Sequence, residues 1–256
     1  MLLTVLGCSG SSPGPRAACS GYLLEADGFL LGIELGNGTL AEMQAVRDPF
    51  ALDALLFSHL HPDHCADFSA LTVLRRYHPA PTRDPRANRL PVYAPRDAPD
   101  RFVAAYSPDE ADRATEDLTD VYEFHPLADG IVHIGPFEVT VATATHPCDA
   151  YSFRIVHGGR SLVYTGDTGV SPTLDKLAKG ADTVLADTSW THAASRQRDM
   201  HLSGVEAGQL AQAAGTGRLL VTHVLPWTDG AAVLAEAREE FAGPIQLVVQ
   251  GESFEI

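Results

Sequence analysis

The segment Ala54-Leu55-Leu56-Phe57-Ser58-His59-Leu60-His61-Pro62-Asp63-His64 places three imidazoles and a carboxylate directly after an apolar run. The apolar run predicts a buried strand. His59 and His61 alternate, so at the end of an extended strand their side chains project to the same side. The proline before Asp63 favours a turn that brings Asp63 and His64 back toward the same centre. This set of donors indicates a site for zinc, iron or manganese. The alternative interpretation is a solvated, histidine-rich loop without a metal.

The composition is typical of a soluble globular protein. The chain has 256 residues, of which 45% are hydrophobic and 7% aromatic, and this length suffices for one large α/β domain. No apolar run approaches the roughly 20 residues needed to span a bilayer. The start, Met1 to Gly7, lacks a charged segment and a long apolar segment and predicts a first strand rather than a signal peptide. We therefore expect a single domain over residues 1–256, no membrane partner and a cytoplasmic location.

The charge balance limits the kind of partner. The formal net charge is −15, whereas proteins that bind long nucleic acids usually present many Lys and Arg side chains to the phosphates. A bound pair of metal ions would still attract one small anion locally. The charge therefore favours a small phosphorylated substrate over a large nucleic acid. Residues 79–101 are rich in proline and arginine, which indicates a solvated surface excursion, with a basic rim for a phosphate as the alternative.

Short apolar runs separated by turns form two blocks along the chain. Helices are predicted at residues 40–46, 68–76, 172–179, 204–214 and 231–241. Two blocks of strands flanked by helices predict two sheets packed face to face with helices outside. The predicted strands are 2–6, 22–25, 29–35, 55–57, 91–94, 121–124, 131–134, 137–144, 152–156, 161–164, 183–186, 219–222 and 245–249.

Four later polar residues each directly follow an apolar strand pattern, namely His146, Asp167, Asp187 and His223. Polar residues at strand ends commonly cap or turn the chain, and this is the alternative for each of them. Their recurrence together with a histidine-rich loop indicates instead that they complete a metal site.

The ligands suffice for two neighbouring divalent ions that share one carboxylate. Water held between two such ions would be strongly acidified and would act as hydroxide at neutral pH. One site would take one oxygen of Asp167, and its neighbour would take the other. The first site would use His59, His61 and His146, and the second Asp63, His64 and His223.

The run from His59 to His64 resembles the H-x-H-x-D-H signature of the metallo-β-lactamase superfamily, and the later His, Asp and His match its remaining motifs. This resemblance covers essentially the whole chain. It implies an α/β fold, a four-layer αββα sandwich of two mixed β-sheets with helices on both outer faces. It also implies two divalent metal ions, zinc first, with Mn²⁺ or Fe²⁺ as the alternatives. Within the superfamily the chain resembles the ribonuclease Z-like branch, through residues 4–11, 166–168 and 201–207.

His201 resembles the histidine of that branch that is not a metal ligand and assists phosphodiester cleavage, either by protonating the leaving oxygen or by stabilising the developing charge. Glu206 lies five residues on and is predicted to orient His201. The alternative is that Glu206 and Ser203 only cap the helix that begins there. We take Asp63, His201 and Glu206 as the candidate catalytic residues.

The length of the segment between His146 and Asp167 indicates the class of substrate. The tRNA-processing endonucleases of the branch carry a long basic arm at this point, whereas here only 20 residues (147–166) intervene. Through residues 4–13, 58–64, 75–79, 189–192 and 223–228, the chain also resembles a group of actinobacterial atypical class II cyclic-nucleotide phosphodiesterases. The resemblance implies hydrolysis of cyclic AMP or cyclic GMP to the 5′-monophosphate. The candidate substrate contacts are Tyr77, Trp190, His192 and Trp227.

Two alternatives to a cyclic-nucleotide phosphodiesterase stay open. One is a ribonuclease Z-like endonuclease that processes RNA or the 3′ end of tRNA. The other is a metal-dependent nucleotide-binding protein without turnover. The sequence is also compatible with a homodimer. One departure from the superfamily pattern is Glu34, where an aspartate usually follows the strand and supports the ligand loop.

Overall fold

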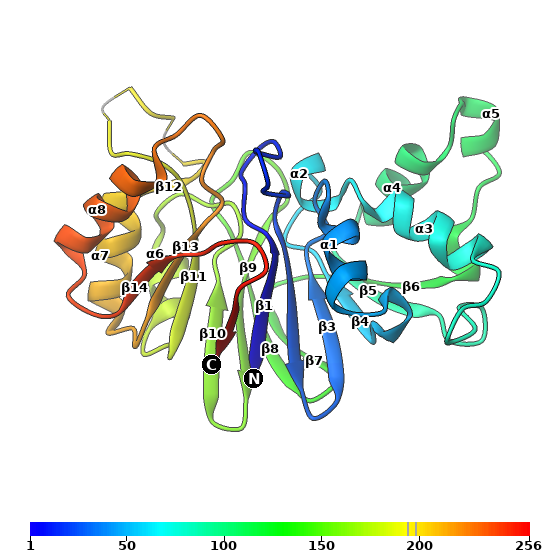
Figure 1. Cartoon of the computed structure of the whole chain (residues 1–256), viewed down its shortest axis with the longest axis horizontal. Coiled ribbons are helices and arrows are strands. Elements are labelled where there is room, and N and C mark those ends of the chain that lie inside the picture. The colour runs from blue at the N-terminus through cyan, green and yellow to red at the C-terminus, as the bar shows by residue number, and fades with distance from the viewer. Residues whose placement is uncertain (194, 198) are drawn as a thin grey trace.

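Two β-sheets lie face to face in the middle of the molecule, and helices cover the outer side of each (Figure 1). This computed structural model describes residues 1–193, 195–197 and 199–256. The architecture confirms the predicted αββα sandwich of two mixed sheets. Within the described ranges, no helix is both long enough and apolar enough to cross a lipid bilayer.

The first sheet has seven strands in the order β15-β1-β2-β3-β4-β5-β6. Strands β15 to β3 pair in antiparallel fashion, and β3 to β6 pair in parallel. Strands β1 and β15 bring the two termini together, and the backbone N–H of Ile256 donates to the carbonyl of Met1 at 2.9 Å. The strands are β1 (Leu2–Gly7), β2 (Gly21–Ala26), β3 (Phe29–Ile33), β4 (Ala54–Leu56), β5 (Leu90–Ala94), β6 (Tyr122–Pro126) and β15 (Ser253–Glu255).

The second sheet repeats this plan, with order β14-β13-β11-β10-β9-β8-β7 and β12 added beside β11. Here β7 to β10 pair in antiparallel fashion, and β10, β11, β13 and β14 pair in parallel. Strands β8 and β10 both lie antiparallel to β9, so they run in the same direction. The strands are β7 (Gly130–Ile134), β8 (Phe137–Thr143), β9 (Tyr151–His157), β10 (Arg160–Tyr164), β11 (Thr183–Trp190), β12 (Leu202–Ser203), β13 (Leu219–Thr222) and β14 (Ile245–Leu247).

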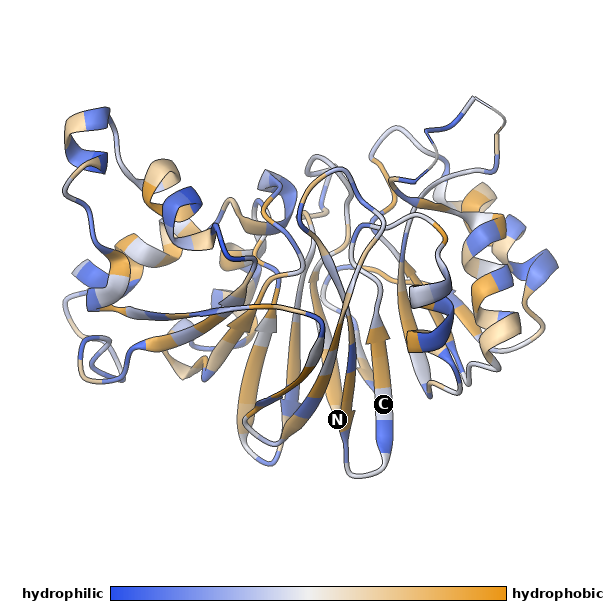
Figure 2. Cartoon of the chain, turned by 180° about the vertical axis from the view of Figure 1, so that it is seen from behind, coloured by the Kyte–Doolittle hydropathy of each residue, from blue (hydrophilic) through white to orange (hydrophobic). Residues whose placement is uncertain are grey.

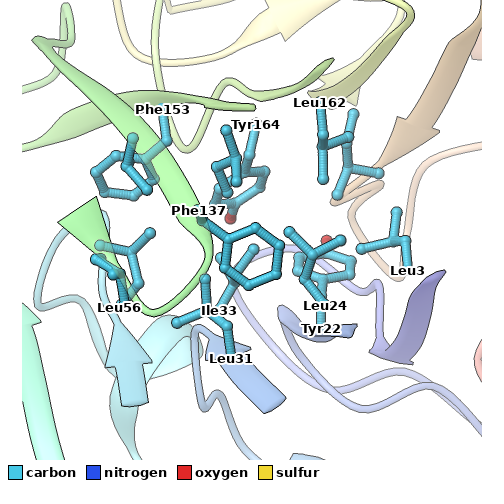
Figure 3. Close-up of a cluster of buried hydrophobic side chains, with 14 of the residues drawn as sticks. Leu3, Tyr22, Leu24, Leu31, Ile33, Leu56, Phe137, Phe153, Leu162 and Tyr164 are labelled. Carbon is cyan, nitrogen blue, oxygen red and sulfur yellow. The ribbon is translucent and has the colours of Figure 1, made fainter. Parts of the chain in front are cut away.

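Both faces of the central strands are buried, which explains their continuous apolar runs. On β2, Tyr22 and Leu24 point into the space between the sheets, and Leu23 points to the outer helices. Figure 3 shows the cluster between the sheets, in which side chains of the first sheet meet Phe137 and Phe153 of the second. This layer holds the two sheets in a fixed relation to each other.

The helices lie on the outer faces, and Figure 2 shows that hydrophobic residues concentrate in the strands between them. Helices α1 (Thr39–Val46), α3 (Phe68–Tyr77) and α4 (Ala98–Tyr106) pack on the first sheet, and α6 (Pro172–Ala178), α7 (Gly204–Ala214) and α8 (Gly230–Glu240) pack on the second. The shorter helices are α2 (Pro62–Cys65), α5 (Glu110–Arg113), η1 (Pro49–Ala51) and η2 (Leu118–Asp120).

Strand β11 is the main departure from the predicted boundaries. It continues to Trp190, four residues beyond the predicted end at Ala186. The polar residues Asp187, Thr188 and Ser189 are buried within it, because the neighbouring strands β12 and β13 extend the ladder on both sides. A polar residue after an apolar run therefore did not mark the end of this strand.

Candidate metal centre

The polar residues predicted from strand ends gather at one edge of the second sheet. His146 follows β8, Asp167 follows β10 and His223 follows β13. Because these strands run in the same direction, their carboxyl ends meet at the same edge. The histidine-rich segment that follows β4 lies against these strand ends, where His61 contacts His146 and His59 contacts Asp167.

The turn predicted after His61 is the short helix α2 (Pro62–Cys65). His61 is its N-cap and Pro62 occupies its first turn, where a missing N–H is tolerated. The helix presents Asp63 and His64, and both are buried. The local sequence thus forms a compact loop whose four donors face inward.

The first group of donor atoms matches the first predicted metal site. Nε2 of His59 lies 3.0 Å from Nδ1 of His61, and Nε2 of His146 lies 3.2 Å from the same Nδ1 atom. Oδ2 of Asp167 lies 3.5 Å from Nε2 of His59. One donor atom from each of the four residues lies within 4.8 Å of the others.

The second group surrounds the other oxygen of the same carboxylate. Oδ1 of Asp167 lies 3.1 Å from Nε2 of His64 and 3.6 Å from Nε2 of His223. Oδ2 of Asp63 lies 3.5 Å from each of these two nitrogens. Asp167 therefore stands between the two groups and offers one oxygen to each, as the sequence predicted.

The donor atoms fit a pair of bound cations. Within the described ranges, Nε2 of His64, Oδ1 of Asp167 and Nε2 of His223 are buried without any hydrogen-bond partner. Leaving buried polar atoms unpaired is costly, and a divalent ion would coordinate all three. Burial and the adjacent imidazoles hold the pKa of His59 well below its usual range, which keeps it in the neutral form that metals bind. The fold and these clusters together imply divalent metal ions.

The far nitrogens of the imidazoles are held by neighbouring groups. Nδ1 of His223 hydrogen-bonds the hydroxyl of Ser20 at 2.8 Å, and Nδ1 of His146 donates to the carbonyl of Met200 at 3.1 Å. Such bonds set the tautomer, so that Nε2 is free to coordinate an ion. Sequence reasoning missed Ser20, whose position carries no signal apart from its place beside β2.

The glycine- and serine-rich loop between β1 and β2 packs directly on the centre. The backbone N–H of Ser11 donates to Oδ2 of Asp63 at 2.7 Å. A Cβ atom on Gly10 would lie 2.4 Å from the ring of His223, so only glycine permits this approach. Ser11, Glu34 and His223 have φ values of 57°, 59° and 59°, in the left-handed region. Non-glycine residues in this region store strain, which is typical of functional sites.

Glu34 lies under the ligand loop and is fully buried. Its Oε1 accepts from the backbone N–H of Ser58 at 3.0 Å and lies 3.6 Å from Nδ1 of His64. The longer side chain thus spans the distance to both the backbone of the loop and one of its histidines. Glutamate in place of the usual aspartate at position 34 therefore still provides a carboxylate behind the metal ligands.

His201 lies beside the metal-ligand groups and is held by Asp187. Its Nδ1 donates to Oδ2 of Asp187 at 2.8 Å and lies 3.7 Å from Oδ2 of Asp167. Burial alone would lower its pKa, but the Asp187 carboxylate outweighs burial and raises the pKa of His201 to about 9. The hydrogen bond to Asp187 therefore fixes the orientation of the His201 imidazole. Asp187, considered above as a metal ligand, holds His201.

The prediction that Glu206 orients His201 is wrong. Glu206 forms a capping box with Ser203 at the start of α7, in which each side chain bonds the backbone of the other. Its Oε1 also pairs with Arg196. One carboxylate oxygen is thus engaged in capping the start of the helix and the other in an ion pair, and it is Asp187 that orients His201.

The four predicted substrate contacts separate in space. Trp190 packs edge to face with His201, with ring centroids 5.1 Å apart, and Nδ1 of His192 bonds the hydroxyl of Ser203 at 2.8 Å. Trp227 is 71% exposed on the loop that follows His223. Tyr77 lies at the far end of α3, about 15 Å of helix away from α2. The structure therefore brings Trp190 to the centre and leaves Tyr77 out of it.

The comparisons with known proteins agree with this geometry. The family described as "Beta-lactamase superfamily domain" matches residues 35–224. The uncharacterized protein Rv1339 of Mycobacterium tuberculosis is 43% identical over 257 residues, which cover 99% of this chain and 92% of that protein. A ribonuclease Z of Mycolicibacterium gilvum is 31% identical over 249 residues, covering 88% and 84%. The crystal structure of the metallo-β-lactamase fold protein YhfI from Bacillus subtilis matches with a TM-score of 0.84 at 25% identity, covering 99% and 98%.

Proposed function

Because the chain belongs to the metallo-β-lactamase superfamily and is a metallohydrolase, we propose that it is a phosphodiesterase for small substrates. The proposed reaction is hydrolysis of a 3′,5′-cyclic nucleotide to the 5′-monophosphate. The observation that carries this proposal is the pair of His201 and Asp187, joined at 2.8 Å beside the carboxylate of Asp167. Many classes of hydrolase use a metal centre alone. A fixed proton donor beside the metal centre is needed when the ester has a poor leaving group, such as an alkoxide.

Two divalent ions, for which we propose zinc with manganese or iron as the alternatives, supply Lewis acidity and activate a water molecule when bound. His59, His61 and His146 would hold one ion, Asp63, His64 and His223 the other, and Asp167 both.

His201 supplies the proton that the reaction needs. Asp187 occupies Nδ1 of the ring, which leaves Nε2 to donate to the 3′ oxygen as the bond between phosphorus and that oxygen breaks. The oxygen of water forms the new bond to phosphorus and loses a proton to solvent, from which His201 is reprotonated, and the product is the 5′-monophosphate with a free 3′ hydroxyl. The edge of Trp190 against His201 restricts rotation of the imidazole and shields it from water.

Two features support a small substrate. Between His146 and Asp167 the chain forms only the hairpin of β9 and β10, so it lacks a long arm with which to grip a folded RNA. The net charge of −15 opposes binding of a long polyanion. A cyclic nucleotide carries a single phosphate, whose charge the bound ions would offset.

The rival function is tRNA 3′ processing, and the 31% identity to a protein named ribonuclease Z favours it. It would require a surface that binds tRNA at physiological salt. We expect instead no salt-sensitive tRNA binding.

The deciding experiment assays the metal-loaded protein on cyclic AMP, cyclic GMP, precursor tRNA and bis(p-nitrophenyl) phosphate. We expect the 5′-monophosphate from at least one cyclic nucleotide and no specific cleavage of precursor tRNA. The proposal fails if neither cyclic nucleotide is turned over while another ester is cleaved. Binding of cyclic nucleotides without any product would instead support the role of a nucleotide-binding protein.

The role of His201 has its own test in the leaving group. A 3′ alkoxide needs a proton as it departs, whereas p-nitrophenolate departs without one. His201→Ala should therefore reduce turnover of the cyclic nucleotide much more than turnover of bis(p-nitrophenyl) phosphate. An equal loss of turnover on both substrates would mean that His201 maintains the structure of the metal centre and does not donate the proton.

A further inference from the structure

A pocket lies on the outer side of the first sheet, at the edge opposite the metal centre. Its volume is about 200 Å³. Asp53 directly precedes β4 and Leu90 begins β5, and both line the pocket. The pocket therefore sits at the amino ends of these strands, whereas the metal ligands follow the carboxyl end of β4. It shares no residue with the metal centre.

Arg75 is the buried charge of this pocket. The residue lies on α3 and is only 4% exposed. One of its terminal nitrogens donates to the carbonyls of Asn88 at 3.0 Å and Val121 at 3.3 Å. Its Nε has no hydrogen-bond partner in the part of the chain that the structure describes, and no carboxylate there lies within ion-pair distance of it. The guanidinium also lies over the ring of Tyr122, 5.6 Å from its centroid. A buried guanidinium without a counter-ion is costly, so the pocket holds a positive charge that no carboxylate neutralises.

Two further arginines line the pocket and stand nearer to solvent. Arg83 pairs with Asp53 at 2.8 Å, and its side chain is 51% exposed. Arg89 lies 3.6 Å from Glu123, and its side chain is 47% exposed. Ion pairs of such exposed side chains are weak, so both guanidinium groups can turn toward an anion. Asp53 is the single carboxylate among the described lining residues, which leaves the lining positively charged in a protein of net charge −15.

We propose that this pocket binds a phosphate group, held by Arg75 from within and by Arg83 and Arg89 from the surface. Guanidinium groups present paired donors that match the oxygens of phosphate, and three of them suit a dianion better than a carboxylate. The pocket has room for a phosphate group but not for a polynucleotide. The phosphate is either free inorganic phosphate or the phosphate of a nucleoside monophosphate. This site is independent of the proposed reaction.

The test is calorimetric titration of the metal-loaded protein with inorganic phosphate at low salt. Besides any phosphate bound by the metal centre, we expect a binding event that Arg75→Gln weakens at least about tenfold and that persists in Asp167→Asn, in which the metal centre is disrupted. Phosphate binding that is unchanged in Arg75→Gln, or that disappears in Asp167→Asn, overturns the proposal. So does the absence of any binding at millimolar phosphate.

Because replacing the buried Arg75 can destabilise the fold itself, variants of surface residues provide a second test. Arg83→Gln should weaken binding by up to about fivefold, and Asp53→Asn should strengthen it by a similar factor. Arg86→Gln is the matched control, since Arg86 lies on the same segment, is 59% exposed and does not line the pocket. Equal affinities in all three variants would contradict the site.

Titration with adenosine 5′-monophosphate separates the two sources of the phosphate. Tighter binding than that of inorganic phosphate, still dependent on Arg75, assigns the pocket to a mononucleotide. Weaker binding assigns it to free phosphate. Either result sustains a phosphate site, whereas binding of the nucleotide to Asp167→Asn that is independent of Arg75 counts against it.

Discussion

The two sheets contribute to the metal centre in different ways. The first sheet supplies its donors from one continuous segment, residues 59–64, which follows a single strand. The second sheet supplies one residue at a time from separate strands. The ligands are His146 after β8, Asp167 after β10 and His223 after β13, and the pair beside them is Asp187 within β11 and His201 before β12.

The difference shows two routes to the same geometry. The donors of residues 59–64 are set by local chain geometry, an extended strand end followed by one turn of helix. Those of the second sheet are set by the alignment of strands that run in the same direction. Asp167 joins the two sets because its two oxygens face different groups. The following substitutions test this division.

The largest effect is expected from Asp167→Ala. Loss of the shared carboxylate should remove both ions and lower kcat/KM by roughly a thousandfold, about 4 kcal/mol of transition-state stabilisation. Asp63→Ala should remove one ion only, because Asp63 faces only the second group. Metal analysis of the purified variants measures the number of ions lost, and steady-state kinetics measure the fall in kcat/KM. Asp175→Asn, on the exposed side of α6, is the control, and equal metal loss in the two alanine variants would contradict a bridging role for Asp167.

His201→Ala should act on turnover and leave the metal content unchanged. We expect kcat to fall by about 10²–10⁴-fold, the usual contribution of a general acid. Asp187→Asn should cost about 10–100-fold, because the imidazole remains but loses the carboxylate that orients it. Steady-state kinetics with parallel metal analysis provide the comparison. Loss of an ion in either variant would place these residues among the ligands instead.

Glu34→Gln tests whether the carboxylate behind residues 59–64 strengthens metal binding. An amide still accepts the bond from Ser58 but lacks the charge that faces His64. The affinity for the ion held by His64 should fall by about 10–100-fold, with the other ion retained. Competition with a chelator resolves the two release steps. Simultaneous weakening of both ions would mean that Glu34 holds the loop as a whole.

The smallest effect on activity is expected from Glu206→Ala. The variant loses the capping box and the ion pair with Arg196, so it should be less stable by about 1 kcal/mol and melt about 2–4 °C lower. Its kcat and metal content should equal those of the unchanged protein. Glu239→Ala, on an exposed position of α8, should have no effect on melting. A fall in kcat for Glu206→Ala without a fall in melting temperature would restore its predicted catalytic role.

Much of the fold was predictable because its signals are local. The helix predicted at residues 204–214 coincides with α7, since a capping serine and a following glycine mark its two ends. Strand β11 was predicted too short, because its polar residues are buried by neighbours that are distant in sequence. Helix α4 was missed within a segment rich in proline and arginine, where its amphipathic pattern is short.

The amino-acid sequence by itself determined the ligand loop, the strand-end donors and the sharing of Asp167, because each depends on a strand followed by a polar residue. Only the tertiary structure decided how the remaining polar groups pair. It joined His201 to Asp187, committed Glu206 to the cap of α7 and left Arg75 buried without a carboxylate partner among the described residues. Pairing of side chains depends on which strands and helices become neighbours, and that information is spread over the whole chain rather than carried by any one segment.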